Sequence, residues 1–313
     1  MIPSKQIVIE AGNRVAPFVH RTPVLTSRLL NEMAGAEVFF KCENLQKMGA
    51  FKMRGAINAI QQLSEAQKKG GVVTHSSGNF GQALALAAKN LGVNAYIVMP
   101  SSAPAVKIEA VKSYGGLVTI TEPTLEAREK SAANIVAEKG AVFLHPSNDM
   151  NVIVGQGTAA LELLQDQPGL EYIMSPVGGG GLIAGTALSA HYLGNNCRVI
   201  GAEPMEVDDA YRAFKSGKIE YNTSTDTIAD GLKTNLGDIN FPIIMELVSD
   251  IIRVEEGEIV NAMKLIWERM KLVIEPSSAV PFAALLKERE KFKNKKVGII
   301  LSGGNVELSN LPF

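Results

Sequence analysis

The chain has 313 residues, 46% of them hydrophobic and 20% charged, with a formal net charge of −1, which suggests a globular enzyme of about two domains. The near-neutral charge argues against binding to nucleic acid or to an anionic membrane, and no apolar run approaches the about 18 residues that a membrane span needs. Its two cysteines form no disulfide framework and no signal peptide is recognisable, so we expect a cytoplasmic protein with reduced thiols.

The first part of the chain predicts helices at 7–15 and 27–33, followed by a strand at 36–44. Apolar residues at Ala56, Ile57, Ile60 and Leu63 then predict a helix that begins close to Lys52. Residues 68–71, two lysines followed by two glycines, are interpreted as a polar turn.

From residue 72 the pattern changes to a regular alternation of short apolar strands and helices. The expected strands are 72–75, 95–100, 117–121 and 141–144, and the expected helices are 82–91, 105–114 and 125–139. Strands of four to six apolar residues separated by helices predict a parallel, doubly wound sheet, and therefore an α/β fold.

The alternation then starts again on a larger scale. Strands are expected at 172–176, 198–202, 251–254 and 296–301, and helices at 153–165, 182–193, 209–216, 256–270 and 280–287. We therefore expect a small, mobile domain at 71–148, inserted into a large domain made of residues 1–66 and 149–313.

Lys52 is flanked by Phe51 and lies between Gly49 and Gly55, at the junction of a loop and a helix. An amine near the positive end of a helix dipole is easier to deprotonate, and a neutral lysine can form a Schiff base. Taken alone, a single lysine is far more often an ordinary solvated side chain, and the other motifs decide the interpretation.

Four successive glycines, Gly178, Gly179, Gly180 and Gly181, lie between an expected buried strand and a helix. Their N–H groups at a helix N-terminus form an anion site that suits a phosphate. The run matches neither the Walker lysine pattern nor G-x-G-x-x-G. Two alternatives are a flexible turn and a nucleotide-binding fold, for which Glu203 would be the acidic residue after the next strand.

Two further polar turns follow expected strands. Residues 76–79, Ser-Ser-Gly-Asn, offer hydroxyls and an amide that suit a carboxylate or a phenolate, although an ordinary helix N-cap has the same composition. Residues 302–305, Ser-Gly-Gly-Asn, likewise form a polar glycine turn after an expected strand. Ligands of open α/β sheets bind at such strand ends. An amine nucleophile, a phosphate cradle and these turns together suit an aldehyde cofactor with one phosphate, namely pyridoxal 5′-phosphate.

The sequence resembles the fold-type II pyridoxal-phosphate enzymes, and within them the serine racemase and serine/threonine dehydratase family. The matching stretches are 41–44, 46–52, 76–79, 155–158, 176–181, 227–231, 275–276 and 302–306. They occur in the family's order through nearly the whole chain. The resemblance implies a tryptophan synthase β-like fold, with two doubly wound open-sheet domains and the cofactor between them.

The resemblance also assigns roles to individual residues. Lys52 would carry the cofactor and act as a base, Ser77 would be the second proton carrier, and Ser302 would face the pyridine nitrogen. The full expected cofactor set is Phe51, Lys52, Asn79, Gly178, Gly179, Gly180, Gly181, Leu182, Gly231, Glu275 and Ser302. The expected substrate set is Ser76, Ser77, Asn79 and Arg128, although Arg128 is equally compatible with a solvated position on a helix.

In this family the spacing of Glu203, the Val207 carbonyl and Asp209 holds a divalent cation, which for oxygen ligands is Mg²⁺ or Ca²⁺. Paired acids on a loop are otherwise simply solvated. Relatives bind a nucleotide between subunits of a homodimer, and matching positions make ATP a possible activator here, although Met48 replaces a threonine that some relatives carry. These positions are Ser27, Lys47, Gln82, Tyr114, Lys271 and Asn305.

The resemblance implies β-elimination from a β-hydroxy amino acid, giving a 2-oxo acid and ammonia, with racemisation of serine beside it. Alternatives are elimination from threo-3-hydroxyaspartate, β-replacement of the cysteine synthase type, and a non-catalytic cofactor- or nucleotide-binding protein. Phe80 stands where the family usually has histidine, which affects the expected substrate preference. The four histidines show no nucleophile or metal spacing, and we interpret them as structural.

Overall fold

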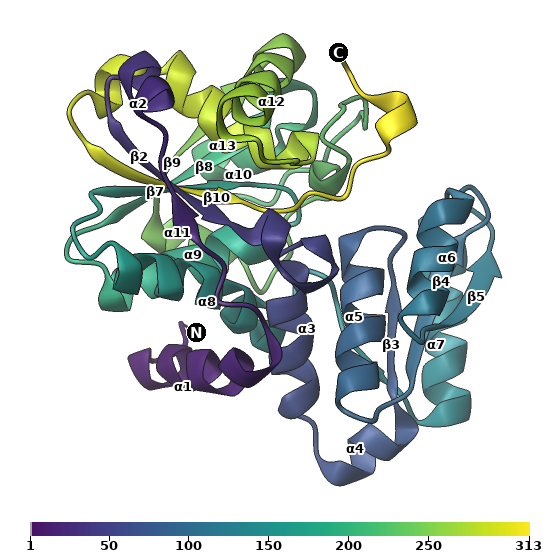
Figure 1. Cartoon of the computed structure of the whole chain (residues 1–313). Coiled ribbons are helices and arrows are strands. Elements are labelled where there is room, and N and C mark those ends of the chain that lie inside the picture. The colour runs from purple at the N-terminus through teal and green to yellow at the C-terminus, as the bar shows by residue number, and fades with distance from the viewer. Residues whose placement is uncertain (1) are drawn as a thin grey trace.

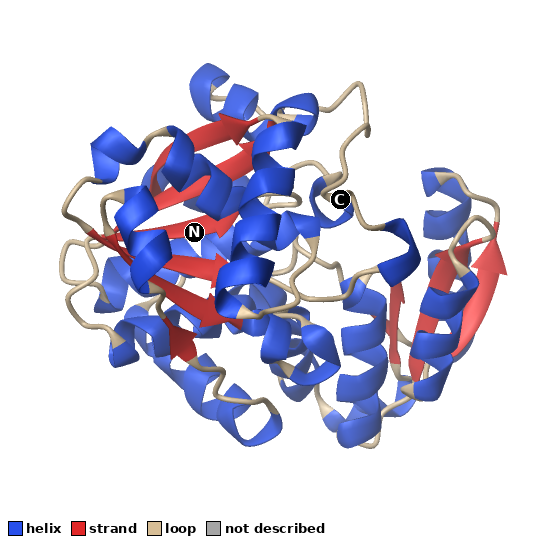
Figure 2. Cartoon of the chain, turned by 45° about the horizontal axis from the view of Figure 1, so that its top comes forward, coloured by secondary structure: helices blue, strands red, loops and turns tan. Residues whose placement is uncertain are grey.

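The structure is a computed structural model that describes residues 2–313, so only residue 1 of the expected large domain lies outside it. Within these residues the strands form a six-stranded and a four-stranded open sheet, each with helices on both faces (Figures 1 and 2). The helix α3 (Lys52–Gln61) lies between the two halves. The predicted α/β class with doubly wound sheets is confirmed, while the domain boundaries stay a prediction.

The six-stranded sheet has the order β1-β2-β10-β7-β8-β9, and all neighbours are parallel except β1 and β2. Its strands are β1 (Val24–Leu25), β2 (Glu37–Cys42), β7 (Tyr172–Pro176), β8 (Arg198–Pro204), β9 (Val248–Val254) and β10 (Lys296–Leu301). The helices of this half are α1 (Lys5–Val15), α2 (Arg28–Ala34), α8 (Met150–Asp166), α9 (Gly181–Leu193), α10 (Asp209–Ser216), α11 (Phe241–Leu247), α12 (Glu256–Met270) and α13 (Pro276–Lys287).

The four-stranded sheet has the order β5-β4-β3-β6, and its strands are all parallel. They are β3 (Val72–His75), β4 (Ala95–Pro100), β5 (Leu117–Thr121) and β6 (Val142–Phe143). The helices of this half are α4 (Glu65–Gly70), α5 (Asn79–Asn90), α6 (Ala105–Ser113) and α7 (Leu125–Lys139). No helix in residues 2–313 has both the length and the apolar character required to cross a membrane.

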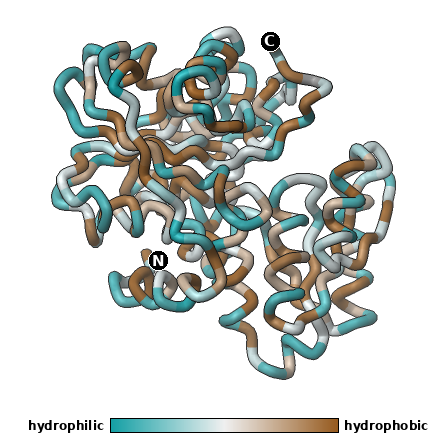
Figure 3. The backbone as a smooth tube through the Cα atoms, in the orientation of Figure 1, coloured by the Kyte–Doolittle hydropathy of each residue, from teal (hydrophilic) through white to brown (hydrophobic). Residues whose placement is uncertain are grey.

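Apolar side chains cover both faces of the large sheet, because successive residues of a strand point to opposite faces. In β10, Val297, Ile299 and Leu301 pack with α2, α12 and α13, whereas Ile300 packs with α1, α8 and α9. The hydropathy colouring shows these strands as apolar segments at the centre of the large half (Figure 3). This two-sided burial is what the short, continuous apolar runs of the sequence predict.

Three elements differ most from the sequence-based expectation. The expected polar turn at 68–71 is the end of α4, which Ser64 and Gln67 initiate through a reciprocal capping box. The helix α11 was not predicted. α13 begins at Pro276, four residues before the expected start, because proline is well suited to the first turn of a helix.

Glycines in α8 allow two other helices to approach its backbone. A Cβ on Gly155 would lie 2.8 Å from the Cα of Gly55 in α3, and a Cβ on Gly157 would lie 2.4 Å from the carbonyl oxygen of Gly185 in α9. Any side chain at these positions would force the helices apart. α8 is therefore in direct backbone contact with both α3 and α9, on either side.

A buried ion network anchors α3 to the large half. Arg54 is fully buried, with its Nε 2.7 Å from Glu43 Oε2 and its Nη1 2.8 Å from Glu162 Oε1. Lys41 Nζ lies 2.7 Å from the other Glu162 oxygen and donates to the carbonyl of Thr22. Because each charge has an opposite charge as its neighbour, the network joins α3 to β2 and α8.

Replacing Arg54 with methionine should lower the free energy of unfolding by about 3–5 kcal/mol, since it leaves the buried Glu43 carboxylate without a cation and leaves Glu162 with Lys41 alone. Urea unfolding of the purified protein measures the change. The control is Arg28→Met, which removes an exposed ion pair to Glu32 and should cost less than about 1 kcal/mol. Equal losses in the two variants would mean that the buried network does not contribute to stability.

Candidate active site

The carboxyl ends of strands from both sheets meet at the residues that the sequence singled out. β10 ends just before Ser302, β7 ends just before the glycine run at 178–181, and β3 ends just before Ser76. Ala50 and Gly303 form an isolated bridge, and the Phe51 amide donates to the Ser302 carbonyl at 3.0 Å. The loop that carries Lys52 is thereby fixed against the end of β10, where open α/β sheets bind ligands.

Lys52 is the first residue of α3, and its half-buried side chain points to the segment that follows β6. Its Nζ donates to the Pro146 carbonyl at 2.8 Å and lies 5.0 Å and 5.7 Å from the ring centres of Phe51 and Phe80. Burial lowers the pKa of Lys52 to about 8, and the negative charge of Glu275 opposes the shift. A substantial fraction of this amine is therefore neutral near pH 8, as a nucleophile or base requires.

Ser302 is buried and has a serine neighbour that the sequence reasoning did not identify. Ser278 Oγ lies 3.0 Å from Ser302 Oγ, donates to the Gly303 carbonyl and accepts from the Gly303 amide, both at 2.7 Å. Because Ser278 uses its only hydrogen on Gly303, Ser302 is the donor between the two hydroxyls. The Ser302 oxygen therefore keeps lone pairs that can accept from a protonated ring nitrogen. The sequence signal was the Ser-Ser pair after Pro276.

Asn79, at the start of α5, connects the two halves of the molecule. Its amide nitrogen donates to both carboxylate oxygens of Glu275, at 3.2 Å and 3.0 Å, and its oxygen accepts from Asn305 at 2.8 Å. Burial raises the pKa of Glu275 to about 7, and the hydrogen bond from Asn79 opposes this. Gly231 packs close by, since a Cβ there would lie 2.9 Å from Ser277 Oγ.

The glycine run has room only for backbone. Gly180 has a φ of +78°, and a Cβ on Gly179 would lie 2.4 Å from Ser147 Oγ. α9 begins at Gly181, so the amides of its first turn, Leu182 included, have no partner within the helix. Ser147 follows Pro146, whose carbonyl binds Lys52, so the amine and the glycine run lie on either side of one short segment.

Gln156 is another residue that the sequence reasoning included only within a matching stretch. It is fully buried, and its amide nitrogen donates to the Pro146 carbonyl at 3.1 Å, beside the Lys52 amine. Its Oε1 has no hydrogen-bond partner among the described residues and lies 2.7 Å from where a Cβ on Gly181 would be. A buried polar atom without a partner, close to the glycine run, is what a bound polar ligand would complete.

The residues present fit pyridoxal phosphate. Lys52 provides an amine of lowered pKa for the aldehyde, the amides at 178–182 provide a phosphate cradle, and Ser302 provides a hydroxyl for the ring nitrogen. Phe51 and Phe80 provide apolar walls beside the amine. The arrangement can hold an aldehyde cofactor and move a proton next to it.

Ser76 and Ser77 lie beside this site, in the half-buried turn between β3 and α5. Ser76 Oγ accepts from the Gly78 amide at 3.3 Å. Arg128 is half-buried on α7, with its Nε donating to the Thr124 carbonyl one turn earlier. Its charge helps to lower the pKa of His75, after the effect of burial, which shows that Arg128 lies near the end of β3.

The expected metal ligands are close together, but protein donors already bind them. Glu203 accepts from the amides of Ala210 and Tyr211, and Asp209 accepts from the Leu236 amide and from Asn222. Burial, followed by the charge of Asp209, raises the pKa of Glu203 well above its usual range, and burial raises that of Asp209 to about 6. Residues 2–313 contain no group of three or more His, Cys, Asp or Glu side chains arranged for a metal.

The expected nucleotide residues are brought together only in part. Asn305 donates to the carbonyl of Met48, next to Lys47, and Gln82 lies on α5, which packs against that turn. Ser27 precedes α2 and Lys271 ends α12 in the large half, whereas Tyr114 ends α6 in the small half. Their common binding of a nucleotide stays a prediction.

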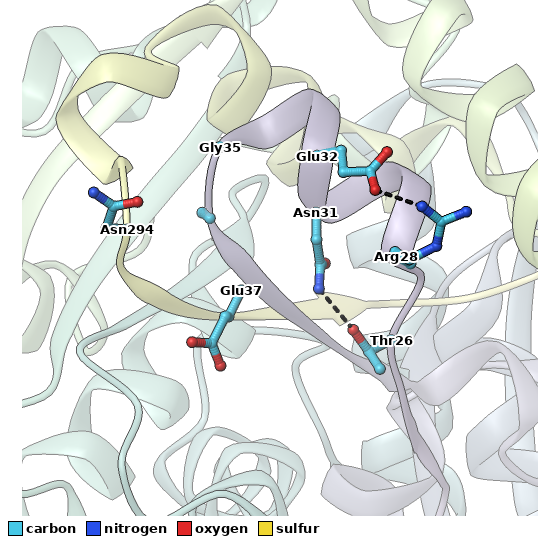
Figure 4. Close-up of a pocket in the computed structure, with 8 residues that line it drawn as sticks. Thr26, Arg28, Asn31, Glu32, Gly35, Glu37 and Asn294 are labelled. Atoms are coloured by element: carbon cyan, nitrogen blue, oxygen red, sulfur yellow. Dashed lines mark hydrogen bonds and ion pairs between the residues drawn. The ribbon is translucent and has the colours of Figure 1, made fainter.

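A surface hollow of about 500 Å³ lies away from this site (Figure 4). It is formed around Gly35 and Glu37 at the amino end of β2, next to Thr26 and Asn31, which form a 3.2 Å hydrogen bond. Ligands of open α/β sheets bind at the opposite, carboxyl ends of the strands. The candidate active site is therefore the one at Lys52, not this hollow.

Comparison with known proteins supports the fold and the cofactor that these residues fit. Residues 15–303 match the family model described as pyridoxal-phosphate dependent enzyme. The serine racemase of Dictyostelium discoideum is 52% identical over 306 residues, 96% of this chain and 94% of that protein. The beta-hydroxyaspartate dehydratase of Paracoccus denitrificans is 48% identical over 312 residues, 100% and 99% of the two chains.

A solved structure of maize serine racemase superimposes with a TM-score of 0.96 at 46% identity, covering 99% of this chain and 95% of that one. The family match and these relatives extend over nearly the whole chain, both sheets included. The chain therefore belongs to the fold-type II pyridoxal-phosphate-dependent enzymes, in the group that contains serine racemases and hydroxyaspartate dehydratases.

Proposed function

We propose that the protein eliminates the β-hydroxyl from a small β-hydroxy amino acid, giving a 2-oxo acid and ammonia, and racemises serine in the same site. The observation that carries this proposal is the Lys52 amine, whose pKa is lowered to about 8 and which is held at 2.8 Å from the Pro146 carbonyl, beside the Ser76–Ser77 turn. The relatives named serine racemase support the racemisation.

Bound pyridoxal phosphate would supply the sink for the electrons left behind when the α-proton departs. Lys52, with its neutral Nζ, would take that proton. Ser76, Asn79 and Arg128 orient the substrate through its carboxylate. Ser77 would hold a proton at its Oγ and deliver it to the α-carbon from the face that Lys52 does not serve, which gives the D-amino acid.

A panel of substrates tests this function. Purified holoenzyme should release a 2-oxo acid and ammonia from L-serine, L-threonine or L-threo-3-hydroxyaspartate, and chiral chromatography should detect D-serine formed from L-serine. Addition of sulfide should leave the yield of oxo acid unchanged. Formation of cysteine in place of pyruvate would favour β-replacement, and no product from any substrate would favour a binding protein.

We also propose that Glu203, Asp209 and the Val207 carbonyl bind Mg²⁺ or Ca²⁺, with water completing the shell. Two buried carboxyl groups with raised pKa values support this, because the charge of Arg212 only partly opposes the effect of burial at Asp209 and a divalent ion would stabilise both charged forms. We propose, in addition, a homodimer with ATP as an activator, which light scattering and activity with and without ATP would test.

Chelation should lower both the activity and the melting temperature, and Mg²⁺ or Ca²⁺ should restore both. Saturating an ion site to about 100 times its dissociation constant stabilises a protein by about 2.7 kcal/mol, so the shift is measurable by calorimetry. Asp209→Asn, which keeps the side chain's shape, should make the melting temperature insensitive to chelator. If chelator changed neither the activity nor the melting temperature of the wild-type protein, the proposed ion site would be wrong.

A further inference from the structure

Two histidines lie side by side at the carboxyl edge of the small sheet. β3 and β6 are parallel neighbours, with Val73 paired to Phe143. His75 is the last residue of β3, and His145 lies two residues after the end of β6. Their ring centres are 6.3 Å apart, with an interplanar angle of 89°. The ring centre of Phe143 lies 5.3 Å from that of His75 and 6.3 Å from that of His145. Both imidazoles are half-buried.

The hydrogen-bond partners of His145 determine which ring nitrogen carries its proton. Nδ1 accepts from the Ser147 amide at 3.2 Å and from the Asn148 amide at 2.8 Å. Nδ1 must therefore be unprotonated, and the hydrogen is on Nε2. Burial, followed by the charges of His75 and Lys52, lowers the pKa of His145 to about 4, so the ring is a neutral N–H donor at physiological pH.

The two rings are next to the reacting groups. His145 directly precedes Pro146, whose carbonyl binds Lys52 Nζ at 2.8 Å, and His75 directly precedes the Ser76–Ser77 turn. The pKa of His75 is lowered by burial and then by the Arg128 charge. Glu129 and Asp238 act in the opposite direction at His75 and His145, but each has a smaller effect than the cations.

We propose that His75 and His145, with Arg128 beside them, form a subsite for a second carboxylate on the substrate. Serine has no second carboxylate to bind in this subsite. A dicarboxylic β-hydroxy amino acid such as 3-hydroxyaspartate carries its second carboxylate on the β-carbon, beside the departing hydroxyl. Nε2–H of His145 and a ring N–H of His75 donate to that carboxylate, and the guanidinium of Arg128, which also attracts the first carboxylate of the substrate, lies close enough to His75 to add a favourable charge. The subsite rests on the proposed elimination and specifies its substrate.

The decisive variant is His145→Asn, because the asparagine oxygen can replace Nδ1 as the acceptor for the Ser147 and Asn148 amides while the Nε2 donor is lost. A hydrogen bond to a charged group corresponds to roughly tenfold or more in affinity. The ratio of kcat/KM for L-threo-3-hydroxyaspartate to that for L-serine should therefore fall at least tenfold, mainly through KM. His75→Asn is the second variant and should change the ratio in the same direction.

The matched control is His191→Asn, on the exposed surface of α9, which should leave the ratio unchanged. A binding measurement separates the subsite from the reaction. L-aspartate has the second carboxylate but no β-hydroxyl, and L-alanine has neither, so the cofactor absorbance reports their binding without elimination. Wild-type holoenzyme should bind L-aspartate more tightly than L-alanine, and His145→Asn should lose at least tenfold of that preference.

The subsite would be wrong if the histidine variants lost equal factors in kcat/KM for L-threo-3-hydroxyaspartate and for L-serine. It would also be wrong if both variants kept the wild-type preference for L-aspartate over L-alanine. If the wild-type enzyme releases no oxo acid from any substrate, the proposed elimination fails, while the aspartate titration still tests the subsite. If the enzyme eliminates from serine and the histidine variants alter no ratio, the elimination stands and the subsite is wrong.

Discussion

Lys52→Ala should abolish turnover of every substrate, with a loss of about 10⁴-fold or more in kcat. Two functions disappear together, because Lys52 is both the amine for the aldehyde cofactor and the base that takes the α-proton, and a positioned base alone contributes about 10²–10⁴-fold. The variant should still fold, since the side chain makes one hydrogen bond, to Pro146. Its melting temperature and its rates of oxo-acid and D-serine formation measure the two effects.

A chemical test accompanies this variant. Borohydride reduction of the wild-type holoenzyme should attach the cofactor permanently to the peptide that contains Lys52, and mass spectrometry identifies that peptide. Lys139→Ala, at an exposed end of α7, is the matched lysine control and should behave as wild type. A cofactor fixed to a different lysine, or substantial turnover by Lys52→Ala, would contradict the assignment.

Ser77→Ala should abolish conversion of L-serine to D-serine and elimination from D-serine, by about 10³-fold, while elimination from L-serine survives. The reason is geometric, because one base cannot readily serve both faces of a planar intermediate. We propose that Lys52 serves one face and that the Ser77 hydroxyl, just before the N-cap Gly78 of α5, serves the other. Pyruvate release from each enantiomer, alongside chiral chromatography, measures both reactions.

Ser76→Ala is the informative comparison for Ser77. Ser76 precedes it in the same turn and is expected to bind the substrate carboxylate, which both enantiomers carry. Loss of the Ser76 hydroxyl should therefore slow the reactions of L-serine and D-serine to a similar degree. Continued D-serine formation by Ser77→Ala would mean that water or another group delivers the second proton.

Much of this architecture follows from the sequence because it depends on local patterns. The short apolar runs predict buried parallel strands, and the residues after them, such as Lys52 and Ser302, are then expected at one edge. The elements that differ depend on other effects. α4 forms because Ser64 and Gln67 satisfy each other's backbone donors, and this outweighs the two glycines at 70–71 that suggested a turn. α11 is short and partly buried, so its periodicity is weak.

The finer contacts of the site were not predictable because they join residues far apart in the chain. Ser278 approaches Ser302 only after α13 packs against β10, and Glu275 meets Asn79 only where the two halves touch. The two histidines were interpreted as structural because their spacing of 70 residues resembles no motif; the parallel pairing of β3 and β6 brings them together. These contacts depend on strand register and tertiary packing, which a single sequence specifies only indirectly.

The backbone contacts of α8 have a consequence for how such an enzyme changes during evolution. Gly55 is one turn from Lys52 and Gly185 is one turn from Gly181, and both meet α8 without intervening side chains. The span between the two candidate cofactor anchors, Lys52 and the glycine run, is therefore set largely by main-chain contacts, and mutations in the surrounding core have little means of adjusting it. New substrate preferences must then arise on the opposite wall, among the residues that β3, β6 and α7 present.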